Sequence, residues 1–244
     1  MISIIIPTLN EERFLPLLLE SLQRQTRRDF EVIVADAGSK DRTRDITLNF
    51  GCTITEGGTP ARGRNCGARV AKGEWVVFLD ADVILPHDFL DRAMNEMERR
   101  RLDIASPFIA PLNGRRIDKI FFGFYNWYSV ITRPVYPHAP GFCIFVRRTL
   151  HEALDGFDEA TLLAEDHDYV LKASRLGRFG LLRRIRVPVS MRRFEKDGHV
   201  NIALKYVAAE AHRIFLGPIN SNIFRYRFGH YEESRCRRRD RGGS

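Results

Sequence analysis

Short apolar runs alternate with longer amphipathic stretches through the first hundred residues of the chain. The apolar runs are rich in β-branched residues and end at turn residues, which is typical of strands covered on both faces. The amphipathic stretches have the helical period and close on glycine. The predicted strands are 2–6, 30–39, 52–56 and 74–80, and the predicted helices are 40–51 and 61–73. This alternation predicts right-handed βαβ units, and therefore an α/β fold with a mostly parallel, Rossmann-like sheet flanked by helices.

Capping residues and shorter runs predict the remaining elements. Asn10 offers an N-cap, and Glu11 and Glu12 would lie in the first turn of the helix that it begins. In the second half the predicted elements are a strand at 141–148, a helix at 165–177 and one or two strands at 179–191. We expect one domain, because 244 residues with 44% hydrophobic content can bury one substantial core.

Residues with ligand-binding chemistry lie at or near the carboxyl ends of several predicted strands. They are Pro7, Thr8, Asp36, Asp80 and Asp82. Ligands of open parallel sheets bind beyond the carboxyl ends of the strands, so these five scattered positions are expected on one rim. Two carboxylates one residue apart can hold a hard divalent cation such as Mg²⁺ or Mn²⁺, together with water and phosphate oxygens. The same aspartates would also be satisfied by facing solvent or by capping the next helix, because the spacing alone is common.

Three stretches, in this order, resemble the family 2 glycosyltransferases, which have the nucleotide-diphospho-sugar-binding GT-A fold. They are 3–43 with SIIIPTLN and VIVADAGS, 61–86 with GEWVVFLDADVILP, and 156–177 with AEDHDY. The resemblance implies a single GT-A domain at 1–190, with a nucleotide-sugar-binding half (1–100) and an acceptor half (101–190). A basic, partly helical extension would follow at 191–244, with a disordered end.

The resemblance also implies a role for each matching residue. It places these residues against the nucleotide and its diphosphate: Pro7, Thr8, Glu11, Asp36, Arg62, Arg64, Asp80 and Arg193. Asp36 would meet a uracil-type base edge, and Ala37 stands where the commoner family form has a second acid, which leaves the base open. Asp80 and Asp82 match the DxD motif that holds Mg²⁺ or Mn²⁺, with Asp82 as the direct metal ligand.

Asp166 matches the acidic position that acts as the base in inverting members of the family. An acceptor hydroxyl loses a proton as it attacks, and a carboxylate opposite the leaving diphosphate can accept that proton. Glu165 and Asp168 compete for the role because they share a helix face, and all three acids could instead only stabilise the helix start. The predicted reaction is transfer of a sugar from a nucleotide-diphosphate donor to an acceptor hydroxyl with inversion. A retaining enzyme of the same fold is the alternative.

The net charge of +8 is concentrated in two basic stretches, 183–198 and 234–244. Such stretches suit nucleic acid, anionic lipid headgroups or diphosphates, and the second is also typical of a solvated tail. A basic nucleic-acid-binding module leaves the rim of carboxylates unexplained, because carboxylates repel phosphate, so we expect no nucleic acid partner. A phosphohydrolase of the haloacid dehalogenase type normally opens its domain with DxD, whereas three predicted βα units precede the motif here.

An uncharged, aromatic run at 120–132 is too short to span a bilayer. It is compatible with a core helix, an acceptor groove or contact with a membrane interface. The stretch 201–219 could lie on lipid as an amphipathic helix, and a lipid-linked acceptor would explain both features. No signal peptide is recognised, and the four cysteines lack the spacing of a metal or disulfide framework. We expect a cytoplasmic protein with peripheral contact to the inner face of the membrane.

Overall fold

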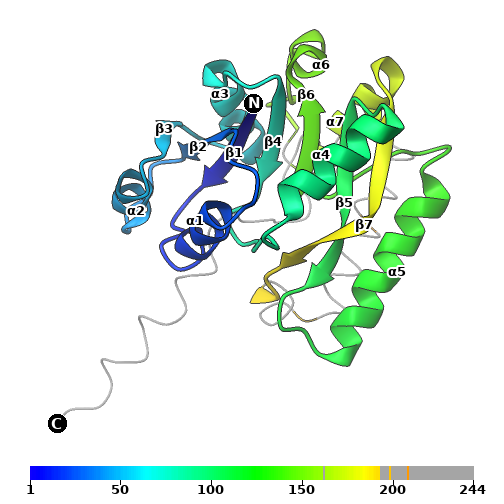
Figure 1. Cartoon of the computed structure of the whole chain (residues 1–244), viewed down its shortest axis with the longest axis horizontal. Coiled ribbons are helices and arrows are strands. Elements are labelled where there is room, and N and C mark those ends of the chain that lie inside the picture. The colour runs from blue at the N-terminus through cyan, green and yellow to red at the C-terminus, as the bar shows by residue number, and fades with distance from the viewer. Residues whose placement is uncertain (162, 193–197, 199–207, 209–244) are drawn as a thin grey trace.

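The computed structural model describes residues 1–161, 163–192, 198 and 208. Figure 1 shows one sheet with helices on both of its faces. Arg193, the basic tail at 234–244 and all but one residue of the stretch 201–219 lie outside the described residues. Every other residue predicted for the site lies within them.

Seven strands form a single sheet in the order β3-β2-β1-β4-β6-β5-β7. Their bounds are β1 Ile2–Thr8, β2 Phe30–Asp36, β3 Thr53–Glu56, β4 Trp75–Leu79, β5 Ile104–Pro111, β6 Cys143–Arg147 and β7 Phe179–Val189. Among the described strands only β6 runs antiparallel to its neighbours, β4 and β5, and the other pairs are parallel. The predicted α/β fold with a mostly parallel sheet is confirmed.

Helices cover both faces of the sheet because successive strand residues point to opposite sides. The helices are α1 Leu15–Gln23, α2 Thr43–Asn49, α3 Pro60–Val70, α4 Phe89–Arg100, α5 Arg116–Thr132, α6 Arg148–Ala153 and α7 Glu165–Leu176. Along β1, Ile4 and Ile6 belong to a buried cluster with residues of α1 and α4, whereas Ile5 belongs to a second cluster with α3 and α7. Burial on both faces explains why the strands are continuous apolar runs.

The first helix begins later than the sequence predicts. Asn10 has a φ of 55°, and its side-chain oxygen accepts a hydrogen bond from the Lys40 N–H at 2.8 Å. Its own N–H donates to Ser39 Oγ at 2.9 Å. α1 starts at Leu15, and the fixed φ of Pro16 suits the first turn of a helix. The prediction of an N-cap at Asn10 is therefore wrong, because a contact between two loops takes its side chain.

The turn that carries Asp80 and Asp82 is fixed against the end of β7, a single strand of 11 residues. Val83 forms an antiparallel bridge with Val189. The Ser190 N–H donates to the Asp82 carbonyl oxygen at 3.1 Å. The chain that leaves β7 therefore runs alongside the aspartates.

Candidate active site

The carboxyl ends of β1, β2 and β4 form the rim on which the candidate residues lie (Figure 1). β1 lies between β2 and β4, and Thr8 is directly opposite Asp36 in the parallel register. Asp80 follows the last residue of β4, and its N–H donates to the Phe142 carbonyl oxygen at 3.2 Å. The structure thus brings together residues that are far apart in the sequence.

Arg64, on α3, is a buried cation that pairs with two acids, Glu165 and Asp80. Its side chain is 3% exposed; Nη1 donates to Glu165 Oε1 at 2.6 Å and Nη2 donates to Asp80 Oδ1 at 3.2 Å. Burial by itself lowers the pKa of Arg64, but the charges of Glu165, Asp80 and Asp166 outweigh it and hold the pKa above its ordinary value. Arg64 is therefore a fixed positive charge between the DxD motif and the start of α7.

Asp166 lies beside Arg64 at the start of α7. Gly141 marks this close approach, because a Cβ added there would be 2.7 Å from Arg64 Nη2 and 3.0 Å from Asp166 Oδ2. A side chain at position 141 would displace one of the two groups. Asp166 Oδ1 accepts a hydrogen bond from the His167 N–H at 2.8 Å, so the first turn of the helix helps to orient this carboxylate.

The two neighbouring acids of α7 are engaged in ion pairs. Burial raises the pKa of Glu165 above its ordinary value, although its partner Arg64 opposes the rise. Asp168 Oδ2 lies 3.4 Å from Lys172 Nζ, one helical turn away. Each of the two acids that compete with Asp166 for the role of base therefore has a basic partner.

Asp82 is buried next to Arg192, on the chain that leaves β7. Arg192 Nε lies 3.1 Å from Asp82 Oδ2, and its two Nη groups donate to the Glu11 carboxylate at 2.8 and 2.6 Å. One guanidinium thus neutralises an acid predicted to bind metal and an acid predicted to bind nucleotide. Asp82 Oδ1 is also buried and has no hydrogen-bond partner among the described residues, which makes it a ready ligand for a cation.

Asp80 and Asp82 fit a divalent cation only together with ligands from outside the chain. In the part of the chain that the structure describes, no three His, Cys, Asp or Glu side chains are grouped as a metal site. Two carboxylates suffice for Mg²⁺ or Mn²⁺ when phosphate oxygens and water complete the coordination. The donor set therefore suits a cation that binds with a phosphorylated ligand.

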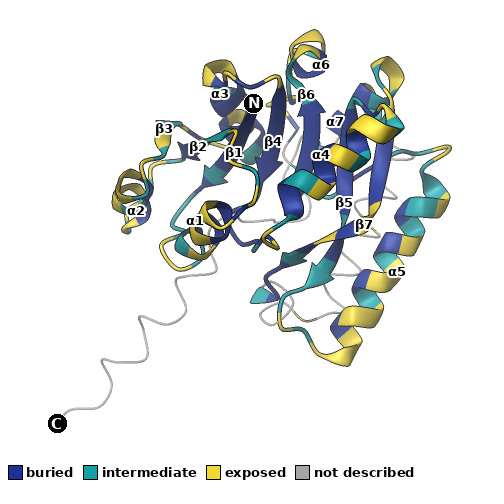
Figure 2. Ribbon diagram, in the orientation of Figure 1, coloured by how far each residue is buried: buried dark blue, intermediate teal, exposed yellow. Residues whose placement is uncertain are grey.

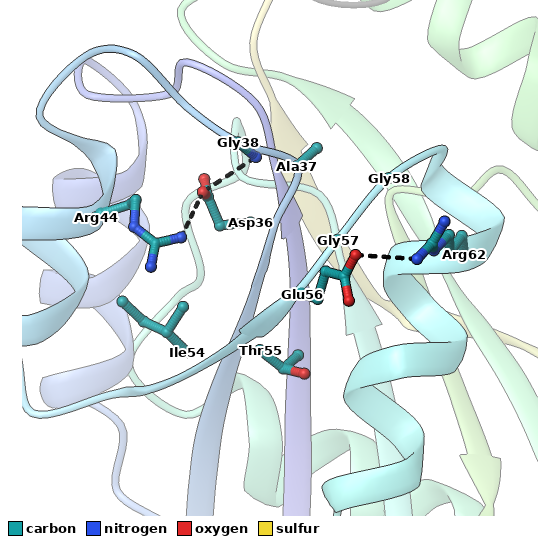
Figure 3. Close-up of a pocket in the computed structure, with 10 residues that line it drawn as sticks. All are labelled: Asp36, Ala37, Gly38, Arg44, Ile54, Thr55, Glu56, Gly57, Gly58 and Arg62. Carbon is teal, nitrogen blue, oxygen red and sulfur yellow. Dashed lines mark hydrogen bonds and ion pairs between the residues drawn. The ribbon is translucent and has the colours of Figure 1, made fainter.

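A cavity of about 610 Å³ lies at the ends of β2 and β3 (Figure 3). On one side Asp36 accepts hydrogen bonds from Ser39 Oγ at 2.5 Å and from Arg44 Nη1 at 3.0 Å. Burial alone raises the pKa of Asp36, but these bonds outweigh it and hold the pKa below its ordinary value. On the other side Arg62 Nη2 donates to Glu56 Oε1 at 3.0 Å. Two arginine–carboxylate pairs therefore line the cavity, and Asp36 is already held by protein donors.

Several of these residues carry no signal in the sequence. Arg44 and Glu56 belong to no motif and reach the cavity only because β3 pairs with β2 and α2 packs on β3. Gly141 is recognisable only from the side chains that crowd it. Arg193, predicted to contact the diphosphate, lies outside the described residues, and the described basic side chain at that end of the chain is Arg192.

The part of the chain that forms the rim of the sheet matches a known protein family. The sequence profile described as glycosyl transferase family 2 matches residues 3–154, which is more than half of the chain. The chain belongs to glycosyl transferase family 2. The matched range of this family 2 protein contains Asp36, Arg64 and the DxD motif, and it ends before Asp166.

Two curated relatives of this family 2 protein are longer than the chain. An uncharacterized glycosyltransferase of Haemophilus influenzae is 28% identical over 190 residues, which cover 70% of this chain and 61% of the relative. Poly(ribitol-phosphate) beta-glucosyltransferase of Bacillus spizizenii is 32% identical over 133 residues, which cover 50% of this chain and 21% of the relative. The matched part thus spans about three fifths of the first relative and one fifth of the second.

Solved structures of glycosyltransferases share the fold of this family 2 protein. The mannosyltransferase PcManGT from Pyrobaculum calidifontis, in complex with GDP-Man and Mn²⁺, has a TM-score of 0.67 and 24% identity over 85% of this chain and 64% of that chain. TarS of S. aureus, in complex with UDP, has a TM-score of 0.65 and 24% identity over 80% and 62%. The predicted GT-A fold is thereby confirmed.

Proposed function

We propose that this protein is a metal-dependent glycosyltransferase that moves a sugar from a nucleotide-diphosphate donor to an acceptor hydroxyl with inversion at the anomeric carbon. The observation that carries the proposal is Arg64, which joins Asp80 of the DxD motif to Glu165 at the start of α7. A donor diphosphate at the DxD motif and a base for the acceptor would then lie around the same buried guanidinium.

The nucleotide is proposed to bind along the rim, within residues 1–100, from the cavity to the DxD motif. The cavity would take the base and ribose, with Asp36 and Arg44 on one side and Arg62 on the other. Pro7 and Thr8 lie between the cavity strand β2 and the DxD strand β4. UDP and GDP-Man in the structures of TarS and PcManGT support a nucleotide ligand and leave the base open.

Asp82 and Asp80 are proposed to hold Mg²⁺ or Mn²⁺ when the donor binds. A cation there supplies positive charge for the leaving diphosphate, and the Mn²⁺ complex of PcManGT supports this choice. Arg192 pairs with Asp82 Oδ2 in this structure. When the donor binds, the Arg192 guanidinium would leave that carboxylate and pair with phosphate oxygens, which match its planar fork. Glu11 would then keep Arg192 at the rim. The same phosphate contact is proposed for Arg193.

Asp166 is proposed to take the proton from the attacking acceptor hydroxyl, in an acceptor half at 101–190. A direct displacement needs a base and a stabilised leaving group and forms no covalent intermediate. The position of Asp166 beside Gly141 and Arg64 supports this role, because it puts a carboxylate near the residue that holds Asp80. Retaining transfer is the alternative, since Asp166 lies beyond the family match.

The acceptor is proposed to be lipid-linked, with the protein bound peripherally to the inner face of the membrane. The support is the aromatic run 120–132, which forms most of α5 and exposes apolar side chains. Of the helices that the structure describes, none has both the length and the apolar character needed to cross a bilayer.

A screen of sugar nucleotides tests the proposed function. UDP-linked and GDP-linked sugars are titrated with and without Mn²⁺, and slow donor hydrolysis is followed in the absence of an acceptor. Metal-dependent binding of one donor is the expected result. Salt-dependent retention on DNA without any metal-dependent nucleotide binding would favour a nucleic-acid-binding module instead.

Asp82→Asn is expected to weaken Mn²⁺-dependent donor binding at least tenfold, because one ligand charge is lost where Oδ1 has no protein partner. Titration calorimetry with donor and Mn²⁺ measures the effect. Asp88→Asn is the matched control, since Asp88 pairs with Arg92 on the surface of α4 and should bind as the wild type does. Unchanged metal-dependent affinity in Asp82→Asn would remove Asp82 from the metal site.

Asp36→Ala is expected to lower nucleotide affinity about tenfold or more and to leave metal affinity unchanged. The variant removes the acceptor of the bonds from Ser39 and Arg44 that shape one side of the cavity. Calorimetry with nucleoside diphosphates measures it, and Asp45→Ala, on the exposed side of α2, is the control. Equal nucleotide binding by Asp36→Ala and wild type would show that the cavity is not the base site.

A further inference from the structure

Helix α5 exposes a continuous apolar stripe. Five large apolar side chains, each more than half exposed, recur at every third or fourth position: Ile117, Ile120, Phe124, Trp127 and Ile131. This spacing puts them on one face of the helix, and we name them the α5 stripe. The opposite face is buried, with Asn126 Oδ1 accepting a hydrogen bond from the Ile109 N–H of β5 at 3.1 Å. Figure 2 shows the exposed residues (yellow) recurring along α5.

The α5 stripe has basic residues at both ends, and no charged residue occurs from 120 to 132. The basic residues at its N-terminal end are Arg115, Arg116 and Lys119. At its C-terminal end a hollow of about 530 Å³ is lined by Arg99, Arg100, Arg101, Arg133 and Arg178, and we name these five the arginine hollow. Arg100 pairs with Glu96, and the other four form no ion pair within the residues that the structure describes.

These charges decide which partner fits the α5 stripe. In a symmetric pair of copies a basic end of α5 would meet a basic end, whether the two helices ran parallel or antiparallel. The segment 193–244 carries 11 Lys and Arg against 6 Asp and Glu, so it would meet the same repulsion. An anionic bilayer is complementary in charge, and Trp and other aromatic side chains favour its interfacial region.

We propose that the α5 stripe and the arginine hollow dock this protein on an anionic phospholipid surface. The stripe enters the boundary between headgroups and acyl chains with α5 parallel to the surface. The arginines of the hollow pair with headgroup phosphates, which match the guanidinium fork. Apolar contact and charge act together, so a neutral bilayer binds weakly.

Docking through α5 also brings the acceptor side of the site to the lipid, a consequence that rests on the proposed function. The His138 ring lies 5.2 Å from the Tyr128 ring of α5 and 5.0 Å from the His167 ring of α7. His167 follows Asp166 directly. A contiguous set of rings therefore links the docking helix to the proposed base, and the acceptor is drawn from the surface on which α5 lies.

Trp127 is an intrinsic reporter of docking, because the chain has two tryptophans and the other, Trp75, is buried. In the full-length Trp75→Phe protein, vesicles of phosphatidylcholine with phosphatidylglycerol are expected to shift Trp127 emission to shorter wavelength. Wild-type protein should sediment with the same vesicles and be released by high salt. Pure phosphatidylcholine vesicles and free glycerol phosphate should leave the emission unchanged, which distinguishes a lipid surface from a soluble phosphate.

Paired variants test the two parts of the docking surface by sedimentation. The double variant Ile120→Gln with Phe124→Gln should lower vesicle affinity about tenfold. Its control is Leu48→Gln with Leu176→Gln, which changes two apolar side chains that are each 64% exposed and lie outside the α5 stripe. The control should leave vesicle affinity unchanged. Arg101→Gln with Arg178→Gln should lower it about thirtyfold. Arg69→Gln with Arg175→Gln, on α3 and α7, removes the same charge elsewhere and should have a much smaller effect.

Three outcomes would overturn the docking proposal. The first is that the protein does not sediment with anionic vesicles at low salt. The second is that, without lipid, the emission of Trp127 shifts to shorter wavelength as the protein concentration rises. The third is that acrylamide hardly quenches the emission of Trp127 in the full chain without lipid. The second outcome would mean that a second copy of the protein covers the α5 stripe. The third would mean that the protein's own segment 193–244 covers it. Asp166→Asn should bind vesicles as the wild type does, so the loss of catalysis and the loss of docking are separate results.

Discussion

Asp166→Asn is expected to cut sugar transfer by about 10²–10⁴-fold while leaving donor and metal binding nearly intact. Asparagine keeps the shape of the side chain and its bond to the His167 N–H, but it cannot accept a proton from the acceptor. Single-turnover transfer measures the chemical step, and calorimetry with donor and Mn²⁺ measures binding. A fall in kcat with unchanged donor affinity is the result that a base predicts.

The neighbouring acids provide the controls for this experiment. Asp168→Asn should keep most of the transfer, because Asp168 forms an ion pair with Lys172 within α7 and is not the proposed base. Glu165→Gln should instead lower stability and donor affinity, because it weakens the hold on Arg64. If Asp168→Asn abolished transfer and Asp166→Asn retained it, the base would lie two residues further along α7. Full transfer by all three variants would favour a retaining displacement.

Much of the sheet is predictable because strands buried on both faces are apolar runs. The runs at 2–6, 30–39, 52–56 and 74–80 correspond to β1 to β4. β5 is not predicted from the sequence, because Ser106 and Pro107 interrupt its apolar pattern. Its register with β7 shifts directly after Pro107. β6 lies between β4 and β5 in the sheet and is antiparallel to both. No pattern in the residues of β6 predicts this direction.

The rim of the site is also predictable, because parallel strands must end at the same edge of the sheet. The ion pairs are not, because they join residues that only the complete fold brings together. Arg64 and Glu165 are 101 residues apart, and Glu11 and Arg192 are 181 apart. The roles inferred for the rim residues stay predictions, whereas their positions on one edge are observed.

The run 120–132 shows where periodicity alone falls short. The core-helix interpretation is correct for one face, which buries Phe122, but the same helix exposes Phe124 and Trp127. Aromatic residues occupy both faces, so the sequence pattern does not distinguish the packed side from the exposed side. The arrangement of the five arginines of the hollow is likewise tertiary, because they come from three separate segments.

Arg64→Met is expected to destabilise the protein by about 3–5 kcal/mol, because it leaves the carboxylates of Asp80 and Glu165 without their buried partner. For a chain of this size that corresponds to a fall in Tm of roughly 6–20 °C. Donor binding should weaken as well, since Asp80 loses the group that orients it. Thermal denaturation and donor calorimetry measure the two effects.

Two further variants separate the charge of Arg64 from its geometry. Arg64→Lys keeps the charge, but a single ammonium group cannot bond Asp80 and Glu165 as the guanidinium fork does, so part of both losses should remain. Arg64→Met with Glu165→Gln removes one of the orphaned charges and should recover part of the stability without recovering donor affinity. If Arg64→Met melted within about 2 °C of the wild type, less than the shift that 1 kcal/mol produces, Arg64 would not be the cation that holds the DxD motif to α7. The proposed function would then lose the contact on which it depends.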